Sequence, residues 1–172
     1  MGAAGSAPEP AMAPTPPKKL LEVCVTRPAV PRPKGPDGQL LDYFALARLI
    51  GEAGSEHRLE WGQAVQVPCF SDTPRIKFQV LAALSHDAIS QGSAFHVSEV
   101  CIPYAGPAGL QELGLSPNGP QVDMRLALVH GAKIEDMSVA EQTKDFQRAK
   151  RGMPPDAWQV AITIREYAVE PP

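Results

Sequence analysis

The sequence contains no long apolar run, and aromatic residues make up only 6% of its 172 residues. Its purely apolar runs are far shorter than the roughly 20 residues that a helix needs to cross a bilayer. No secretory signal follows the first residues, and no Asn-X-Ser/Thr glycosylation sequence occurs. These absences argue against a secreted or membrane-spanning protein. Any contact with a membrane is therefore expected to be peripheral.

Cysteine is also scarce, with three residues at Cys24, Cys69 and Cys101. An odd number without paired spacing predicts reduced thiols, as in cytosolic proteins. Each thiol is most simply interpreted as a small apolar core residue. We therefore expect a cytoplasmic location and no disulfide bonds.

The motifs of common enzyme classes are missing as well. No phosphate-binding loop or dinucleotide fingerprint occurs, and no two histidines have the helical i, i+4 spacing of a metal site. The adjacent Ser, His and Asp at 85–87 are sequence neighbours, whereas a catalytic triad is assembled from distant segments. The sequence thus predicts no catalytic residue, no metal site and no cofactor. The alternative is a small enzyme with an unrecognised pocket formed by Cys101, His96 or His130.

Proline, in contrast, is abundant: nine of the nineteen prolines lie between residues 8 and 36. Residues 1–19 are rich in Ala, Pro and Gly and offer too little apolar surface to offset the entropy of ordering. They are predicted to form a disordered tail. Residues 20–172 have the length and the apolar content of one domain.

The net charge of −3 is distributed unevenly. Between residues 18 and 34 five cations are opposed only by Glu22, whereas residues 35–172 are acidic. Sequence-specific nucleic-acid binding requires a broader positive face, so it is not expected. A short basic segment can instead approach anionic membrane lipids. The residues predicted to bind the membrane are Lys18, Lys19, Arg27, Arg32 and Lys34.

The first six residues, MGAAGS, match the myristoylation pattern M-G-x-x-x-[ST], which predicts an acyl chain on Gly2. One such chain anchors a protein only marginally, and the basic segment supplies a second signal. The alternative is that MGAAGS is the small-residue start of a flexible tail. Pro14 and Pro17 have the PxxP spacing that suits SH3-type domains, or they belong to a simple proline-rich linker.

Periodicity predicts mostly strands after residue 20. A bulge is expected in the strand at 94–104, because its apolar phase slips between Val97 and Val100. Helices are predicted at 39–52 and 138–151, the second beginning with a capping box of Ser138 and Glu141. The sequence therefore predicts an α+β fold with a mostly antiparallel sheet and two main helices. The expected strands lie at 20–26, 58–68, 75–87, 94–104, 122–131 and 157–167.

The order of these elements resembles that of rhabdovirus matrix proteins. The similar segments are LLEVCVT, DYFALARLI, FQVLAALS, VDMRLALV, KDFQRAK and AWQVAITI. The tail has fewer lysines than is typical of that family and lacks a clean PPxY motif. The resemblance implies membrane binding through Lys18 and Lys19, self-association, and contact with a nucleocapsid in a virion.

From the sequence we expect a non-enzymatic, peripheral membrane-associated assembly protein, matrix-like, that binds the anionic inner leaflet and itself. Acyl insertion, Coulombic attraction and self-association would each be weak, and together they would raise the avidity. The alternative is a soluble interaction module that presents its proline-rich tail to an SH3-type domain.

Overall fold

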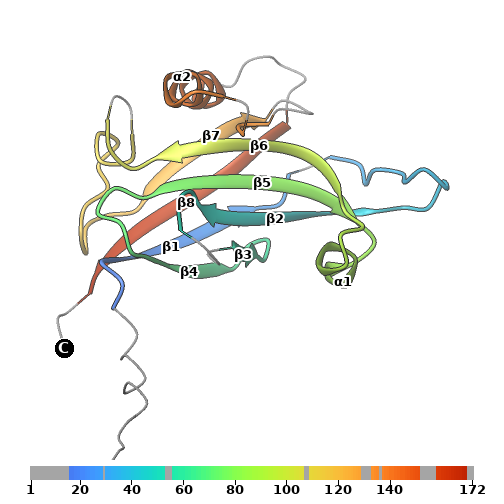
Figure 1. Ribbon diagram of the computed structural model, residues 1–172, viewed down its shortest axis with the longest axis horizontal. Coiled ribbons are helices and arrows are strands. Elements are labelled where there is room, and N and C mark those ends of the chain that lie inside the picture. The colour runs from blue at the N-terminus through green and yellow to red at the C-terminus, as the bar shows by residue number, and fades with distance from the viewer. Residues whose placement is uncertain are drawn as a thin grey trace, which may run out of the picture.

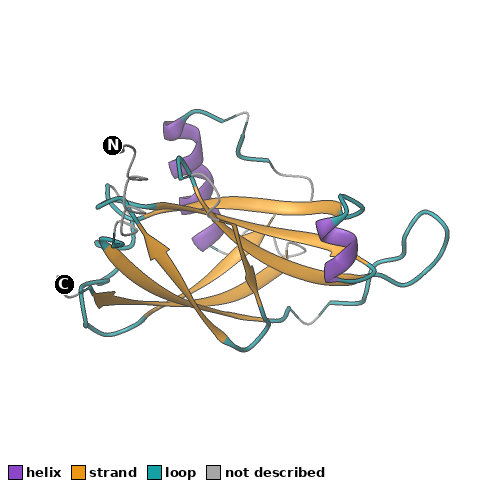
Figure 2. Cartoon of the chain, turned by 60° about the horizontal axis from the view of Figure 1, so that its bottom comes forward, coloured by secondary structure: helices purple, strands orange, loops and turns teal. Residues whose placement is uncertain are grey.

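Two antiparallel sheets of four strands pack face to face in the computed structural model (Figure 1). The first sheet has the strand order β4-β1-β8-β7, and the second has the order β3-β2-β5-β6. Figure 2 shows the two layers of strands with a helix outside them. The structure describes residues 16–28, 30–52, 56–106, 109–128, 133–135, 137–151 and 158–169.

All the strands pair antiparallel with their neighbours. The first sheet consists of β1 (Lys19–Thr26), β4 (Ala64–Cys69), β7 (Val122–Leu128) and β8 (Trp158–Ala168). The second sheet consists of β2 (Asp42–Leu49), β3 (Glu56–Leu59), β5 (Arg75–Ala83) and β6 (Phe95–Pro103). The helices are α1 (His86–Ser90) and α2 (Val139–Lys150).

The core lies between the sheets and follows the two-residue period of the strands. The predicted faces of the first sheet are confirmed in β1 and β7, whose alternate apolar residues are buried. In the second sheet, β5 is buried on both faces, and on its outer side Lys77 is covered where it pairs with Glu135. The inward residues of β1 and β8 are Leu21, Val23, Val25, Val160, Ile162 and Ile164.

The predicted antiparallel pairing is confirmed, but the α+β architecture requires correction. The strands form two packed sheets instead of one, so the molecule is a β-sandwich with two short helices. The apolar face of each sheet is covered by the other sheet, and no layer of helices is needed to bury it. The predicted tail lies almost wholly outside the described residues, and the first strand begins at Lys19.

The predicted helix at 39–52 is wrong, because these residues form the central strand β2. Its eight residues pair with β5 over their whole length, and four of them also pair with β3. The segment is apolar nearly all round because both its faces are buried, with Ala45 and Leu46 3% exposed or less. Its Leu and Ala favour a helix locally, but pairing on both edges decides the structure.

The second predicted helix and the bulge are confirmed. The Ser138 hydroxyl accepts a hydrogen bond from the backbone N–H of Glu141, and the backbone N–H of Ser138 donates to the Glu141 carboxylate, which completes the capping box of α2. In β6 the register of pairing with β5 shifts at Val97, which has no residue opposite it on β5. The helix packs on β6 and β7, with Phe146 fully buried.

Different connections between the strands lie at the two ends of the sandwich. At one end lie the β1–β2 connection 27–41 and the segment 84–94 with α1 (Figure 1, right). The tight β3–β4 turn 60–63 faces this end, because Trp61 forms a bridge with Val25 and its Nε1 donates to the Tyr43 carbonyl. We call this the loop end. The opposite, far end contains the start of β1, the end of β8, and the connections 70–74 and 104–121.

Candidate functional site

The longest connection at the loop end is folded into a small hairpin over residues 33–41. Lys34 and Leu40 pair as an antiparallel bridge, and the backbone N–H of Gly35 donates to the carbonyl of Gln39 at 2.8 Å. The turn ends at Gly38, whose φ of +80° is the left-handed conformation that glycine adopts without strain. This 33–41 hairpin therefore projects as an ordered unit with internal backbone hydrogen bonds.

Helix α1 is tied to the second sheet beside the hairpin. The Arg58 guanidinium donates to the Ser90 hydroxyl and, at 3.5 Å, to the carbonyl of His86. The His86 ring lies 4.5 Å from that of Phe44, and its Nε2 is 3.5 Å from a carboxylate oxygen of Glu60. These contacts fix α1 against β2 and β3, so the loop end has a defined shape.

Three large apolar side chains of this loop end are exposed to solvent. Leu40 is 52% exposed on the hairpin, Leu84 is 60% exposed before α1, and Phe95 is 45% exposed where β6 begins. Neighbouring exposed apolar residues commonly mark a site of contact with a membrane or a partner. Sequence analysis missed all three, because they fall within the segments predicted as the helix 39–52 and the strands 75–87 and 94–104.

Three of the five predicted cations lie at or beside the same end. Lys34 is exposed on the hairpin, and Arg32 is exposed while its Nε donates to the Leu41 carbonyl at 2.9 Å. Arg27 forms an ion pair with Asp42. Burial alone would raise the pKa of Asp42, but the hydrogen bond and charge of Arg27 outweigh burial and lower it. Arg32 and Lys34 are thus the more available charges.

The other two predicted cations lie at the far end, about 25 Å away along the eight residues of β1. Lys18 is exposed and lies 3.4 Å from Asp72. Lys19 is largely buried, with its Nζ 3.5 Å from Glu166 and 4.6 Å from the centre of the Tyr104 ring. The basic segment is therefore divided between two opposite ends.

Lys19 belongs to a buried network. Burial would lower its pKa, but the hydrogen bond with Tyr104 and the charge of Glu166 outweigh that effect and raise it. The Tyr104 hydroxyl donates to Glu166, whose side chain is only 2% exposed. The ammonium of Lys19 thus compensates a buried carboxylate inside the fold.

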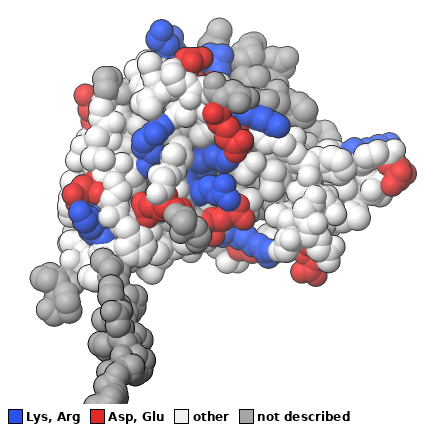
Figure 3. Space-filling model, viewed as in Figure 1, with Lys and Arg blue, Asp and Glu red and all other residues white. Residues whose placement is uncertain are grey.

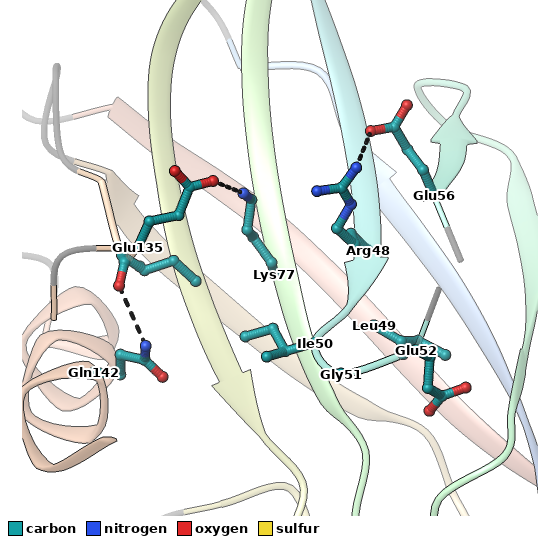
Figure 4. A pocket seen from close by; sticks show the side chains of 10 residues that line it. Arg48, Leu49, Ile50, Gly51, Glu52, Glu56, Lys77, Glu135 and Gln142 are labelled. Carbon is teal, nitrogen blue, oxygen red and sulfur yellow. Dashed lines mark hydrogen bonds and ion pairs between the residues drawn. The ribbon is translucent and has the colours of Figure 1, made fainter. Parts of the chain in front are cut away.

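A cavity of about 710 Å³ lies on the outer side of the second sheet (Figure 4). Arg48 pairs with Glu56 at 3.5 Å, and Lys77 pairs with Glu135 at 2.7 Å. Glu52 supplies a third carboxylate to the lining. Figure 3 shows blue and red groups interleaved over this part of the surface. Since opposite charges compensate one another here, the cavity has no single-sign field that would attract an anion.

Of the three candidate residues of the alternative enzyme, the two that the structure describes do not converge. Cys101 is 2% exposed and lines a cavity with Arg75, whereas His96 lines a different cavity beside the hairpin. Burial raises the pKa of the Cys101 thiol, and the neighbouring Arg75 offsets this only in part. A buried neutral thiol is a weak nucleophile. His130, Gly2 and Pro14 lie outside the described residues.

Two further structural findings bear on the site. Within the described residues, no three His, Cys, Asp or Glu side chains are grouped so that they could hold a metal ion. Among the same residues, neither helix has the length and apolarity needed to cross a membrane. The exposed groups of the loop end are therefore the best-defined candidate site.

Comparison with known proteins identifies the fold. The chain is similar to a C2 domain of plant Extended Synaptotagmin 1, with a TM-score of 0.55 and 13% sequence identity. The match covers 91% of this chain and all of that domain. No family model and no curated protein matches the sequence. The molecule thus has the β-sandwich fold of a C2 domain.

The similarity to this fold corrects the resemblance to rhabdovirus matrix proteins, which is wrong. The match extends over nearly the whole chain, including the region where the matrix-like element order was found. That element order depended on a helix at DYFALARLI, which is strand β2. A role in virion assembly or nucleocapsid contact loses its support with it.

Proposed function

We propose that this protein is a non-enzymatic C2-type module that binds anionic membrane surfaces peripherally through its loop end. C2 domains are generally lipid-binding modules and typically have no catalytic activity. The observation that carries the proposal is the grouping of Leu40, Leu84 and Phe95 with exposed cations at one end of the sandwich.

The apolar side chains would supply most of the binding energy. Full burial of a Leu or Phe side chain contributes about 1.5–3 kcal/mol. Each of the three is about half exposed, so insertion of each into the interfacial region contributes roughly 1 kcal/mol. Their separate supports, on the hairpin, before α1 and at the start of β6, make one broad contact.

The cations would supply attraction to the lipid head groups. Each Lys or Arg close to an anionic leaflet contributes about 1 kcal/mol, and salt screens this term within a Debye length of about 8–10 Å. Arg32 and Lys34 lie on the connection that carries Leu40, so charge and apolar surface approach the membrane together. An acyl chain on Gly2 would add to this binding.

Calcium is not expected to be required. C2 domains bind anionic phospholipids, often in a calcium-dependent way. Calcium needs six to eight oxygen ligands, usually from several carboxylates. At this loop end Asp42 is engaged by Arg27, and Glu60 lies beside His86. Among the described residues, Asp37 and Asp87 of this end included, no three His, Cys, Asp or Glu side chains are grouped so that they could hold a metal ion. Vesicle binding in EGTA should therefore equal that in calcium.

The proposal is tested with the unacylated full-length protein and sedimentation of vesicles with and without phosphatidylserine. Wild type should prefer the anionic vesicles, and raising the salt should weaken binding. Arg32→Ala with Lys34→Ala removes about 2 kcal/mol of attraction, so the affinity should fall about 30-fold.

Lys18→Ala provides the control, because Lys18 is also an exposed cation but lies at the far end. It should change the affinity less than twofold. Equal binding to neutral and anionic vesicles, or a Lys18→Ala loss as large as that of the double variant, would contradict the proposal.

A further inference from the structure

A cavity of about 360 Å³ lies under the 33–41 hairpin, where the hairpin faces the adjoining strands of the second sheet. The hairpin forms one wall through residues 33–36 and Leu41, and the other walls come from β2, β5 and β6. Phe95, one of the exposed residues of the loop end, is part of its lining. The cavity thus adjoins the proposed membrane contact. The lining residues are Pro33, Lys34, Gly35, Pro36, Leu41, Tyr43, Ala82, Phe95, His96 and Val97.

The chemistry of this lining differs from that of the larger cavity on the second sheet. It is largely apolar, and it contains Lys34 but no Asp or Glu. His96 is held by its own neighbours, because its Nδ1 lies 3.3 Å from Nε2 of Gln79 and 3.6 Å from an oxygen of Glu99. Burial raises the pKa of Tyr43, so this phenol stays neutral. The fixed charge of the lining is therefore the ammonium of Lys34.

We propose that this cavity accepts the hydrocarbon chain of one fatty carboxylate, taken up as a monomer, with the carboxylate held at Lys34. An apolar wall stabilises the chain by removing it from water, and a cation without a carboxylate beside it in the lining complements an anionic head. The proposal concerns the same end of the molecule as the proposed function and deepens it. It can nevertheless be tested without a membrane.

The volume of the cavity sets the length of the chain. A methylene group takes up about the space of a water molecule in the liquid, roughly 30 Å³. A cavity of about 360 Å³ therefore holds on the order of ten carbon atoms. Each methylene that enters should raise the affinity about fourfold, and methylenes beyond the cavity should add little.

The experiment is isothermal titration of the full-length protein with hexanoate, octanoate, decanoate, dodecanoate and tetradecanoate, each below its micellar concentration. Affinity should rise about fourfold per methylene up to roughly ten carbons and then level off. Decyltrimethylammonium has a chain of similar length but a cationic head, and it should bind at least tenfold more weakly than decanoate.

Variants separate the chain from the head. Lys34→Ala should lower the affinity for decanoate about tenfold, and Lys144→Ala, at an exposed lysine of α2, should leave it unchanged. Ala82→Leu fills the cavity from β5 and should shorten the chain length at which affinity levels off. Because Ala82 is buried, its replacement could disturb the fold, so Phe95→Ser at the exposed rim serves as a second variant. It should lower the affinity for decanoate about fivefold and leave the fold intact.

The outcomes distinguish this proposal from the proposed function. No saturable binding of any carboxylate, an affinity that continues to rise through tetradecanoate, or equal binding of the cationic amphiphile would overturn the cavity proposal. Binding of anionic vesicles by the same protein would still stand in each case. Conversely, an affinity that levels off near ten carbons and falls in Lys34→Ala supports the cavity proposal even if the protein does not bind vesicles.

Discussion

The two ends of the sandwich use the same residue types for different purposes. At the far end, Lys19 is largely buried against Glu166 and Tyr104, and the exposed Lys18 lies beside Asp72. At the loop end, Lys34 is exposed and makes no ion pair among the described residues. The far end also exposes two apolar residues, Phe70 and Leu113, at 47% and 40%. What distinguishes the loop end is therefore available charge beside exposed apolar surface.

The largest effect is expected where the far end stabilises the fold. Glu166→Ala leaves the largely buried ammonium of Lys19 without its carboxylate. Removing one partner of a buried ion pair costs about 3 kcal/mol or more of the free energy of unfolding. Urea denaturation of wild type and variant measures this loss.

Tyr104→Phe provides the graded comparison at the same network. It removes one hydrogen bond to Glu166 and retains the ring beneath Lys19, so it should cost about 1 kcal/mol. Vesicle binding by either folded variant should remain at the wild-type level. A loss of binding without a loss of stability would show that the far end contacts the membrane.

The next effect concerns binding at the loop end. Replacing Leu40, Leu84 and Phe95 together by Ser removes roughly 3 kcal/mol of apolar transfer energy, which corresponds to about a 100-fold weaker affinity for anionic vesicles. Because all three side chains are substantially exposed, the unfolding free energy should change by less than about 1 kcal/mol. Vesicle titration and urea denaturation of the same preparation check both values.

Phe70→Ser with Leu113→Ser is the matched variant of the far end, since it removes similarly exposed apolar surface. Its affinity for vesicles should stay within about twofold of wild type. If the two variants lose binding equally, the protein has no preferred membrane-contacting end and the comparison fails.

The strands could be predicted from the sequence wherever one face of a strand is buried and the other is wet. The alternating apolar residues of β1 and β7 gave the right faces, and Val160, Ile162 and Ile164 of β8 are all buried. The capping box gave α2. Strand β2 was missed because it is buried on both faces, so its pattern carries no period of two, and its alanines and leucines favour a helix.

The candidate site could be predicted less well. The basic segment drew attention to Arg32 and Lys34, but the same count of charges included Lys19, whose partner Glu166 lies 147 residues away in the sequence. Local composition cannot show such a partner. Nor could it show that Leu40 and Phe95, 55 residues apart, reach the same end, because that follows from how the strands of the sheet pair.

The smallest expected effect is the pH dependence of the stability that the Arg27–Asp42 ion pair of the loop end contributes. The folded-state pKa of Asp42 lies below its ordinary value of 3.8, because Arg27 outweighs the effect of burial. This pairing therefore stabilises the fold fully above about pH 4 and ceases to do so as the pH falls through the lowered pKa. Both side chains are partly exposed, so the contribution is about 1 kcal/mol at most. Asp42→Asn should lower the unfolding free energy by that amount at pH 7, and the gap to wild type should close as the pH falls through the lowered pKa. A gap that persists unchanged at low pH would show that the loss does not come from the charge of Asp42 and that Arg27 is in effect as available to a membrane as Arg32.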